Sequence, residues 1–205
     1  LTVTADTTSG WTTVQSSDGT TVIYENIEAT VGTINDYIVG TAVDETLDGG
    51  AGNDTIIGGG GNDVLIGGTG NDILIGGNGD DTIQAGGGNE LLNGEDGWDK
   101  VSYASAASGV NANLGSGVVT GGSGNDRLVS IEAIEGSAFN DTLTGTAGAD
   151  ELEGGAGDDS IDGGANPPGR DFDAAFYDHA TSAVNVNLAT GRATGGAGND
   201  TLVGI

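Results

Sequence analysis

A nine-residue, glycine-rich repeat governs this sequence. Four consecutive blocks, GGAGNDTII, GGGGNDVLI, GGTGNDILI and GGNGDDTIQ, run without interruption over residues 49–84. Weaker or more distant copies occur around 32–39 and at 40–48, 85–93, 94–102, 136–144, 145–153 and 154–162. Glycine that recurs at fixed spacing indicates a repeat architecture, whereas the same amount of glycine without a period would indicate a flexible linker.

Each block has a six-residue glycine-rich half and a three-residue half with an aliphatic side chain at position eight. The aliphatic residues are Leu47, Ile56, Leu65, Leu74, Ile83, Leu92, Val101, Leu143, Leu152 and Ile161. Three residues are too few for a helical turn with an apolar face, but they suit a short strand whose central side chain points inward. Glycines suit turns that need positive φ. We therefore predict an all-β fold in which turns and short strands alternate as a parallel coil.

The charge of the chain points to a bound cation. Asp and Glu number 31 against 4 Lys and Arg, so the formal net charge is -27. This balance excludes nucleic acid and anionic membrane surfaces as partners, because both require basic residues. Solubility or disorder would explain acidity alone, but here the acids recur at fixed positions. Cysteine is absent, which excludes disulfides and thiolate metal sites, and no apolar run is long enough to span a membrane.

The nonapeptide matches the pattern GGxGxDxUx, and in this respect the chain resembles the RTX (repeats-in-toxin) proteins, whose repeat binds calcium. The resemblance implies a parallel β-roll, a form of β-helix or solenoid, in which two nonapeptides complete one coil. It also implies rows of Ca²⁺ ions between successive turns, bound by carbonyl groups of the glycine-rich turn and by the aspartate at position six. RTX proteins leave the bacterial cell by type I secretion and fold outside it in calcium.

The resemblance implies a specific set of metal-ligating residues. Residues eighteen apart then stack, with Asp54, Asp72 and Glu90 on one side of the roll. On the other side Asp63, Asp81 and Asp99 stack. The expected ligands in the glycine-rich turns are Gly49, Gly52, Gly58, Gly61, Gly67, Gly70, Gly76 and Gly79. In the second array Asp141 and Asp159 stack with Asp150 opposite, and the further expected ligands are Asp126, Asp173 and Asp200.

Stacked carboxylates explain why a cation is needed. Adjacent strands lie about 4.8 Å apart, and two carboxylates about 5 Å apart repel by about 3 kcal/mol at an effective dielectric near 20. Summed over the array, this repulsion is comparable to the whole stability of a small domain. Calcium accepts six to eight oxygen ligands in irregular geometry, whereas magnesium demands a stricter octahedron and zinc prefers nitrogen and sulfur. We expect the calcium-free chain to be largely disordered.

Some blocks depart from the pattern. Ala85 replaces the first glycine of its block, and Glu90 stands where aspartate is usual. Glu95 and Asp96 replace a Gly-x pair before Asp99. For these blocks the alternative stays open that the carboxylates only cap glycine turns. A further block is interrupted by Asn-Pro-Pro-Gly-Arg at 166–170, which we expect to bulge outward because proline cannot donate to a strand ladder. Asp171 or Asp173 then takes position six, and the distance to Tyr177 favours Asp173.

A second kind of unit separates the arrays. Tyr103–Ile131 recurs as Tyr177–Ile205 with 17 of 29 positions identical. Val110, Ala112 and Leu114 alternate with asparagines, which predicts a half-buried strand followed by a hairpin partner at 118–120. We therefore divide the chain into a truncated spacer at 1–31, a roll at 32–102, a spacer at 103–135, a second roll at 136–173 and a truncated spacer at 174–205. Because Leu1 is not a natural start and the last module stops at Ile205, we expect a piece of a longer array.

The sequence favours a structural role over a catalytic one. His179 is the single histidine and is expected in an exposed loop, and no paired-histidine zinc motif or G-x-S-x-G elbow is present. The leading hypothesis is a non-catalytic, calcium-folded region of a type I secreted bacterial protein, extracellular or on the cell surface, as in a surface layer or adhesin. The alternatives are the calcium-binding tail of a secreted protease or lipase and, less favoured, an ice-binding adhesin.

The expected partners are calcium ions and either further copies of the chain or neighbouring modules. Outward positions of the central blocks are apolar at Ile57, Val64, Ile66, Ile73 and Ile75. Strand propensity explains them, and a surface that meets a partner is the alternative.

Overall fold

The computed structural model describes residues 2–6, 11–15, 21–24, 28–30, 33, 35–122, 124–165 and 172–205. The chain separates into two compact units, one formed by residues 1–101 with 129–131 and the other by residues 102–128 with 132–205. All regular elements of the described part are β-strands, which confirms the predicted all-β class. The described residues include no helix of the length and apolarity that a membrane crossing requires. The division into five segments stays a prediction.

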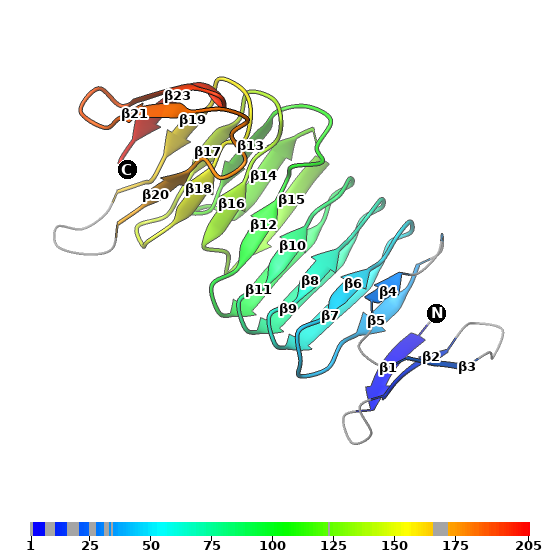
Figure 1. Ribbon diagram of the computed structural model, residues 1–205. Coiled ribbons are helices and arrows are strands. Elements are labelled where there is room, and N and C mark those ends of the chain that lie inside the picture. Colours follow the sequence, from blue (N-terminus) through cyan, green and yellow to red (C-terminus); the bar gives the residue numbers. More distant parts are fainter. Residues whose placement is uncertain are drawn as a thin grey trace. The chain divides into compact units, whose positions relative to one another are not determined.

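Unit 1 is a parallel β-roll with two rows of short strands (Figure 1). The first row is β5 (Tyr37–Val39), β7 (Thr55–Gly60), β9 (Ile73–Asn78) and β11 (Leu91–Asp96). The second row is β4 (Glu28–Thr30), β6 (Thr46–Asp48), β8 (Val64–Ile66), β10 (Thr82–Gln84) and β12 (Lys100–Ser102). Paired residues in each row are eighteen apart, as in Thr55 with Ile73 and Val64 with Thr82. Two nonapeptides therefore complete one coil, as the resemblance implied.

The core of each coil is the aliphatic side chain at position eight. Ile56, Leu65, Leu74, Ile83 and Leu92 are completely buried, and each is the second residue of its strand. The residues on either side of it are less buried, so a strand of three residues offers one side chain to the interior. The inward position predicted from the sequence is confirmed.

Unit 2 repeats the roll with fewer coils. One row contains β13 (Val110–Asn113), β17 (Thr142–Thr144), β19 (Ser160–Asp162) and β23 (Gly198–Val203), all parallel. The other contains β16 (Ala133–Glu135), β18 (Glu151–Glu153) and β20 (Ala174–Phe176). Leu143, Leu152 and Ile161 are completely buried.

The spacers are three-stranded antiparallel meanders. In the first, β13 pairs with β14 (Val118–Gly121), and β14 pairs with β15 (Gly124–Val129). In the second, β21 (Val184–Asn187) and β22 (Arg192–Gly195) pair in the same way with β23. The strands β1 (Thr2–Asp6), β2 (Trp11–Gln15) and β3 (Thr21–Tyr24) form a third meander in unit 1. The hairpin predicted at 118–120 is confirmed.

The third strand of each meander was not predicted. The segment GGxGND at 121–126 looks like half a nonapeptide, but Gly121 pairs with Gly124 across a hairpin turn. Gly195 pairs with Gly198 in the same way. Asp126 and Asp200 therefore lie inside strands β15 and β23, where they face Val119 and Ala193 of the neighbouring strands.

Candidate metal centres

The position-six carboxylates of unit 1 form two columns at the starts of the strands. Asp54 and Asp72 directly precede β7 and β9, while Asp63 and Asp81 directly precede β8 and β10. All four side chains are 1% exposed. Burial of four ionisable groups in this way costs free energy unless each carboxylate finds partners. The hydrogen-bond partners of these carboxylates therefore decide whether the chain itself satisfies them or whether they can bind a cation.

One oxygen of each carboxylate is used within the column. The backbone N–H of Asp54 donates to Oδ1 of Asp72 at 2.8 Å. On the other side the N–H of Asp63 donates to Oδ1 of Asp81 at 2.8 Å, and the N–H of Asp81 donates to Oδ1 of Asp99 at 2.9 Å. Each carboxylate thus ties its own coil to the preceding one. The eighteen-residue stacking expected for these residues is present.

The second oxygen of each carboxylate is buried without a hydrogen-bond donor. This holds for Oδ2 of Asp54, Asp63, Asp72 and Asp81 in unit 1, and for Oδ2 of Asp159 in unit 2. A buried acceptor that lacks a partner costs about 1–3 kcal/mol, and more when it carries charge. Four of these atoms lie at position six of successive repeats and the fifth lies at the same position in the second array, an arrangement that suits oxygen ligands of a cation.

The first glycine of each block faces that second oxygen. A Cβ atom on Gly49 would lie 2.6 Å from Oδ2 of Asp54 and 2.9 Å from the carbonyl oxygen of Gly67 in the next coil. At Gly58 the same distances are 2.5 Å to Asp63 and 2.6 Å to the carbonyl oxygen of Gly76. Only glycine leaves this space open. Carboxylate and carbonyl oxygens therefore converge beside position one.

The glycines at position four bring successive backbones together. Gly52, Gly61, Gly70 and Gly79 all have positive φ. A Cβ atom on Gly70 would collide with the carbonyl oxygen of Gly52, and one on Gly79 with that of Gly61. The expected turn residues thus lie where carbonyl groups of neighbouring coils are stacked. Their role as metal ligands stays a prediction.

Burial raises the pKa values of several carboxyl groups in the columns well above the ordinary value for aspartate. Burial raises the pKa of Asp63 from 3.8 to about 7, against a hydrogen bond from the N–H of Glu45, and the charge of Asp81 raises it further. Burial raises the pKa of Asp72 to about 6, and the charge of Asp54 adds to this. In unit 2 burial raises the pKa of Asp159 to about 7, and the Asp141 and Asp200 charges contribute. A cation at the site would reverse this, because it favours the ionised form.

The donor set fits calcium. The columns offer carboxylate and carbonyl oxygens, which are the ligands that Ca²⁺ accepts at irregular geometry. The orphaned Oδ2 atoms lie in the space that glycine keeps open. If calcium is bound there, it neutralises the stacked carboxylates, and the chain's own residues supply the oxygen ligands and fix the coil spacing.

The departing blocks keep their carboxylates in register. Glu90 is 3% exposed and Asp99 is completely buried. Ala85 is buried as well. This block therefore has a methyl group where other blocks have glycine, and it has a glutamate, which is longer than aspartate, at position six. Glu95 has φ of 72°, the left-handed backbone that glycine has at the same position of other blocks. Metal binding by Glu90 and Asp99 stays a prediction.

Two further expected ligands, Asp200 and Asp173, lie in the roll of unit 2, and Asp126 lies in β15 of the first meander. The backbone N–H of Asp159 donates to Oδ1 of Asp200 at 3.0 Å although the two residues are 41 apart. The N–H of Asp150 donates to Oδ1 of Asp173 at 3.1 Å, so Asp173 occupies position six, while Asp171 lies outside the described residues. Asp126 is 3% exposed.

Two carboxylates of the columns were not among the expected ligands. Asp36 and Glu45 are 4% and 8% exposed. The N–H of Asp36 donates to Asp54 at 2.8 Å, and that of Glu45 donates to Asp63 at 2.9 Å. They lie in the imperfect blocks before residue 49. The eighteen-residue spacing to Asp54 and Asp63 was the signal that identifies them.

In two blocks of unit 2, 136–144 and 145–153, the second oxygen of the position-six carboxylate accepts hydrogen bonds from its own turn. Oδ2 of Asp141 accepts the backbone N–H of Ser137 at 2.6 Å, and Oδ2 of Asp150 accepts that of Thr146 at 2.6 Å. Val110 also donates its N–H to Oδ1 of Asp141 at 2.7 Å. These two expected ligands are in their expected places, but the chain itself satisfies them.

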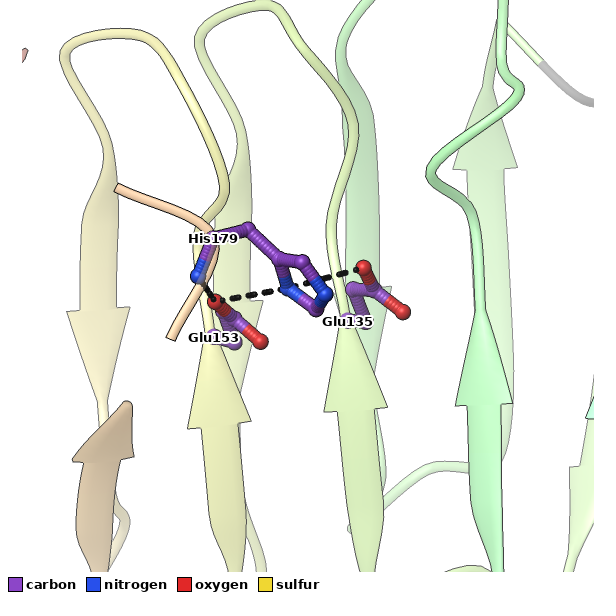
Figure 2. A group of neighbouring side chains, drawn as sticks. All are labelled: Glu135, Glu153 and His179. Carbon is purple, nitrogen blue, oxygen red and sulfur yellow. Dashed lines mark hydrogen bonds and ion pairs between the residues drawn. The ribbon is translucent and has the colours of Figure 1, made fainter. Parts of the chain in front are cut away.

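His179 is exposed, as predicted, but it is also paired. Figure 2 shows its ring between the carboxylates of Glu135 and Glu153. Nδ1 lies 3.0 Å from Oε1 of Glu153 and 3.3 Å from Oε1 of Glu135, and the backbone N–H of His179 also donates to Glu153. The two glutamates are opposite each other on β18 and β16. Their eighteen-residue spacing was the signal, but nothing in the sequence placed His179 beside them.

The apolar outward positions are partly covered. Ile73 is 38% exposed, and Ile57, Val64, Ile66 and Ile75 are half-buried. Ile57 and Ile75 are direct neighbours on β7 and β9. Neighbouring strands therefore supply part of the cover. A partner surface at these positions stays a prediction.

The comparisons with known proteins agree with this geometry. The profile of the RTX calcium-binding nonapeptide repeat family matches residues 32–65, 39–74, 66–101, 111–130, 135–166 and 192–204. These segments cover well over half of the chain. A search of curated proteins returns no match. The chain belongs to the RTX calcium-binding nonapeptide repeat family.

Proposed function

We propose that the chain is a structural, non-catalytic region of a type I secreted bacterial protein and that calcium binding drives its folding outside the cell. The observation that carries the proposal is the set of five buried Oδ2 atoms without a donor, at Asp54, Asp63, Asp72, Asp81 and Asp159. The calcium-free roll has to bury these charges unpaired or keep them protonated. Calcium removes both costs.

The composition supports an extracellular place of action. With 31 acidic and 4 basic residues, the unfolded chain repels itself and stays extended where calcium is scarce. Millimolar calcium outside the cell suits weak, oxygen-rich extracellular sites. A chain that cannot fold before export is suited to passage through a secretion channel.

The test is the far-UV circular dichroism of the full chain near pH 7.5 in excess chelator, in about 5 mM calcium and in about 5 mM magnesium, concentrations sufficient for the millimolar dissociation constants of extracellular calcium sites. We expect a strand spectrum in calcium alone and a disordered spectrum in chelator and in magnesium. A strand spectrum that persists in excess chelator would contradict calcium-dependent folding.

The favoured parent is a surface layer or adhesin, and the alternative is the tail of a secreted protease or lipase. Light scattering in the same titration separates them. Ordered assemblies that form only with calcium favour a lattice, whereas a calcium-folded monomer favours a tail. Ice binding needs matched polar side chains along one face. The stacked position-three residues Ala51, Thr69 and Gly87 do not match, which disfavours it.

A further inference from the structure

The position-six carboxylates fall into two classes according to their second oxygen. In the open class that oxygen is buried without a donor, and its members are Asp54, Asp63, Asp72, Asp81 and Asp159. In the capped class the second oxygen accepts the backbone N–H of position two of the same block, and its members are Glu45, Asp141 and Asp150.

The caps are short and nearly identical. The N–H of Thr41, Ser137 and Thr146 donates to the carboxylate at position six at 2.6 Å in every case. The hydroxyl group of the same residue donates as well, at 2.9 Å in each block. Two donors from position two thus take the place that a cation would need.

The open and capped blocks differ in the residue and the backbone conformation at position two. In the open blocks it is Gly50, Gly59, Gly68, Gly77 or Gly155, and φ lies between 83° and 117°. In the capped blocks it is threonine or serine, none of which has positive φ. Residues with a Cβ avoid positive φ. The turn then takes the other backbone conformation, in which the N–H of position two meets the carboxylate.

Energetics favour different partners in the two classes. A carboxylate that accepts several hydrogen bonds is stable in its charged form, so a cation gains little there and has to displace donors. An open carboxylate accepts a backbone N–H at Oδ1 but has no donor at Oδ2, so a cation relieves the burial penalty of that second oxygen. Burial raises the pKa of Asp141 as well, but hydrogen bonds from Val110 and Ser137 oppose this.

We propose that position two selects which blocks bind calcium: glycine gives an open, calcium-binding block, and threonine or serine gives a capped block that forms without calcium. This inference rests on the proposed calcium-dependent function. The capped blocks are 40–48, 136–144 and 145–153. The second array thus begins with two blocks that need no ion, and the open block 154–162 stacks on the first of them.

The first test compares two matched position-six substitutions in the full chain. Asp72→Asn removes an open carboxylate and Asp141→Asn removes a capped one, and both residues are 1–3% exposed. The number of calcium ions bound per chain is measured by equilibrium dialysis at saturating calcium. We expect Asp72→Asn to lose at least one ion and Asp141→Asn to keep the wild-type number. Equal losses in the two variants would overturn the inference.

The second test creates a site and does not depend on a variant that has lost a carboxylate. Ser137→Gly removes the cap and permits positive φ, so we expect at least one additional ion per chain. Ser137→Ala is the matched control, because alanine removes the hydroxyl but keeps the backbone that delivers the N–H cap. We expect its ion number to be unchanged. An unchanged number in Ser137→Gly would contradict the role of position two.

The two proposals fail in different ways. If the wild-type chain binds no calcium, the proposed function fails and this inference fails with it. If the wild type binds calcium and folds in it, but Asp141→Asn loses as many ions as Asp72→Asn, only the inference fails.

Discussion

At the scale of single residues, glycine has different tasks at different positions of the block. At position one it leaves space beside a carboxylate oxygen, as at Gly49. At position two it supplies positive φ and close approach, as at Gly68, where a Cβ atom would collide with the carbonyl oxygen of Gly50. At position three Gly87 has nothing within 4 Å of an added Cβ atom. Glycines at different positions of the same block should therefore differ greatly in how well they tolerate substitution.

Gly68→Ala should lower the free energy of unfolding of the calcium-loaded chain by about 1–3 kcal/mol, because alanine at positive φ is strained and its methyl group meets backbone. Gly87→Ala is the control and should change stability by less than about 0.5 kcal/mol. Urea unfolding in saturating calcium measures both. Similar losses in the two variants would show that the close approach at Gly68 has no energetic consequence.

At the scale of elements, the roll could be predicted and the spacers only in part. The nine-residue period places Leu65 and Leu74 inward and brings Asp54 next to Asp72, because strand alternation and coil length follow directly from the pattern. The third meander strand could not be predicted in this way. Local sequence at 121–126 fits a nonapeptide turn and a hairpin equally well, and the pairing of Gly121 with Gly124 depends on the preceding strand.

The contact of His179 is a second feature beyond prediction, because it joins segments that no period relates. Glu135 and Glu153 are opposite each other on neighbouring strands, and like charges in such a pair are destabilising. The imidazole lies within 3.3 Å of both. The histidine thus connects the turn before β21 to the row formed by β16 and β18.

His179→Ala should lower the free energy of unfolding by up to about 1 kcal/mol, since it leaves the two glutamates facing each other with fewer donors. The matched variant is His179→Ala with Glu135→Gln, which removes the like-charge pair and should recover most of the loss. A double-mutant cycle by urea unfolding in calcium measures the coupling. Additive effects of the two substitutions would contradict a direct interaction.

At the scale of the whole molecule, protons and calcium compete for the same buried carboxylates. The pKa values of Asp72, Asp63 and Asp159 rise from 3.8 to about 6, 7 and 7 on burial in the calcium-free fold. Between about pH 4 and pH 7 the folded chain therefore binds more protons than the unfolded chain. Its stability must fall as pH rises through that range. Calcium displaces those protons, so calcium affinity must rise with pH over the same range.

The calcium-free chain should consequently gain strand signal near pH 4.5 and lose it near pH 7.5, while the calcium concentration at the folding midpoint should be several-fold higher at pH 5.5 than at pH 7.5. Far-UV circular dichroism in chelator and calcium titrations at the two pH values measure these effects.

Asp63→Asn should flatten the pH dependence, because it removes a buried titrating group, whereas Asp80→Asn at an exposed position should leave the pH dependence unchanged. If the two variants respond alike, net charge and not the buried columns controls the response to pH.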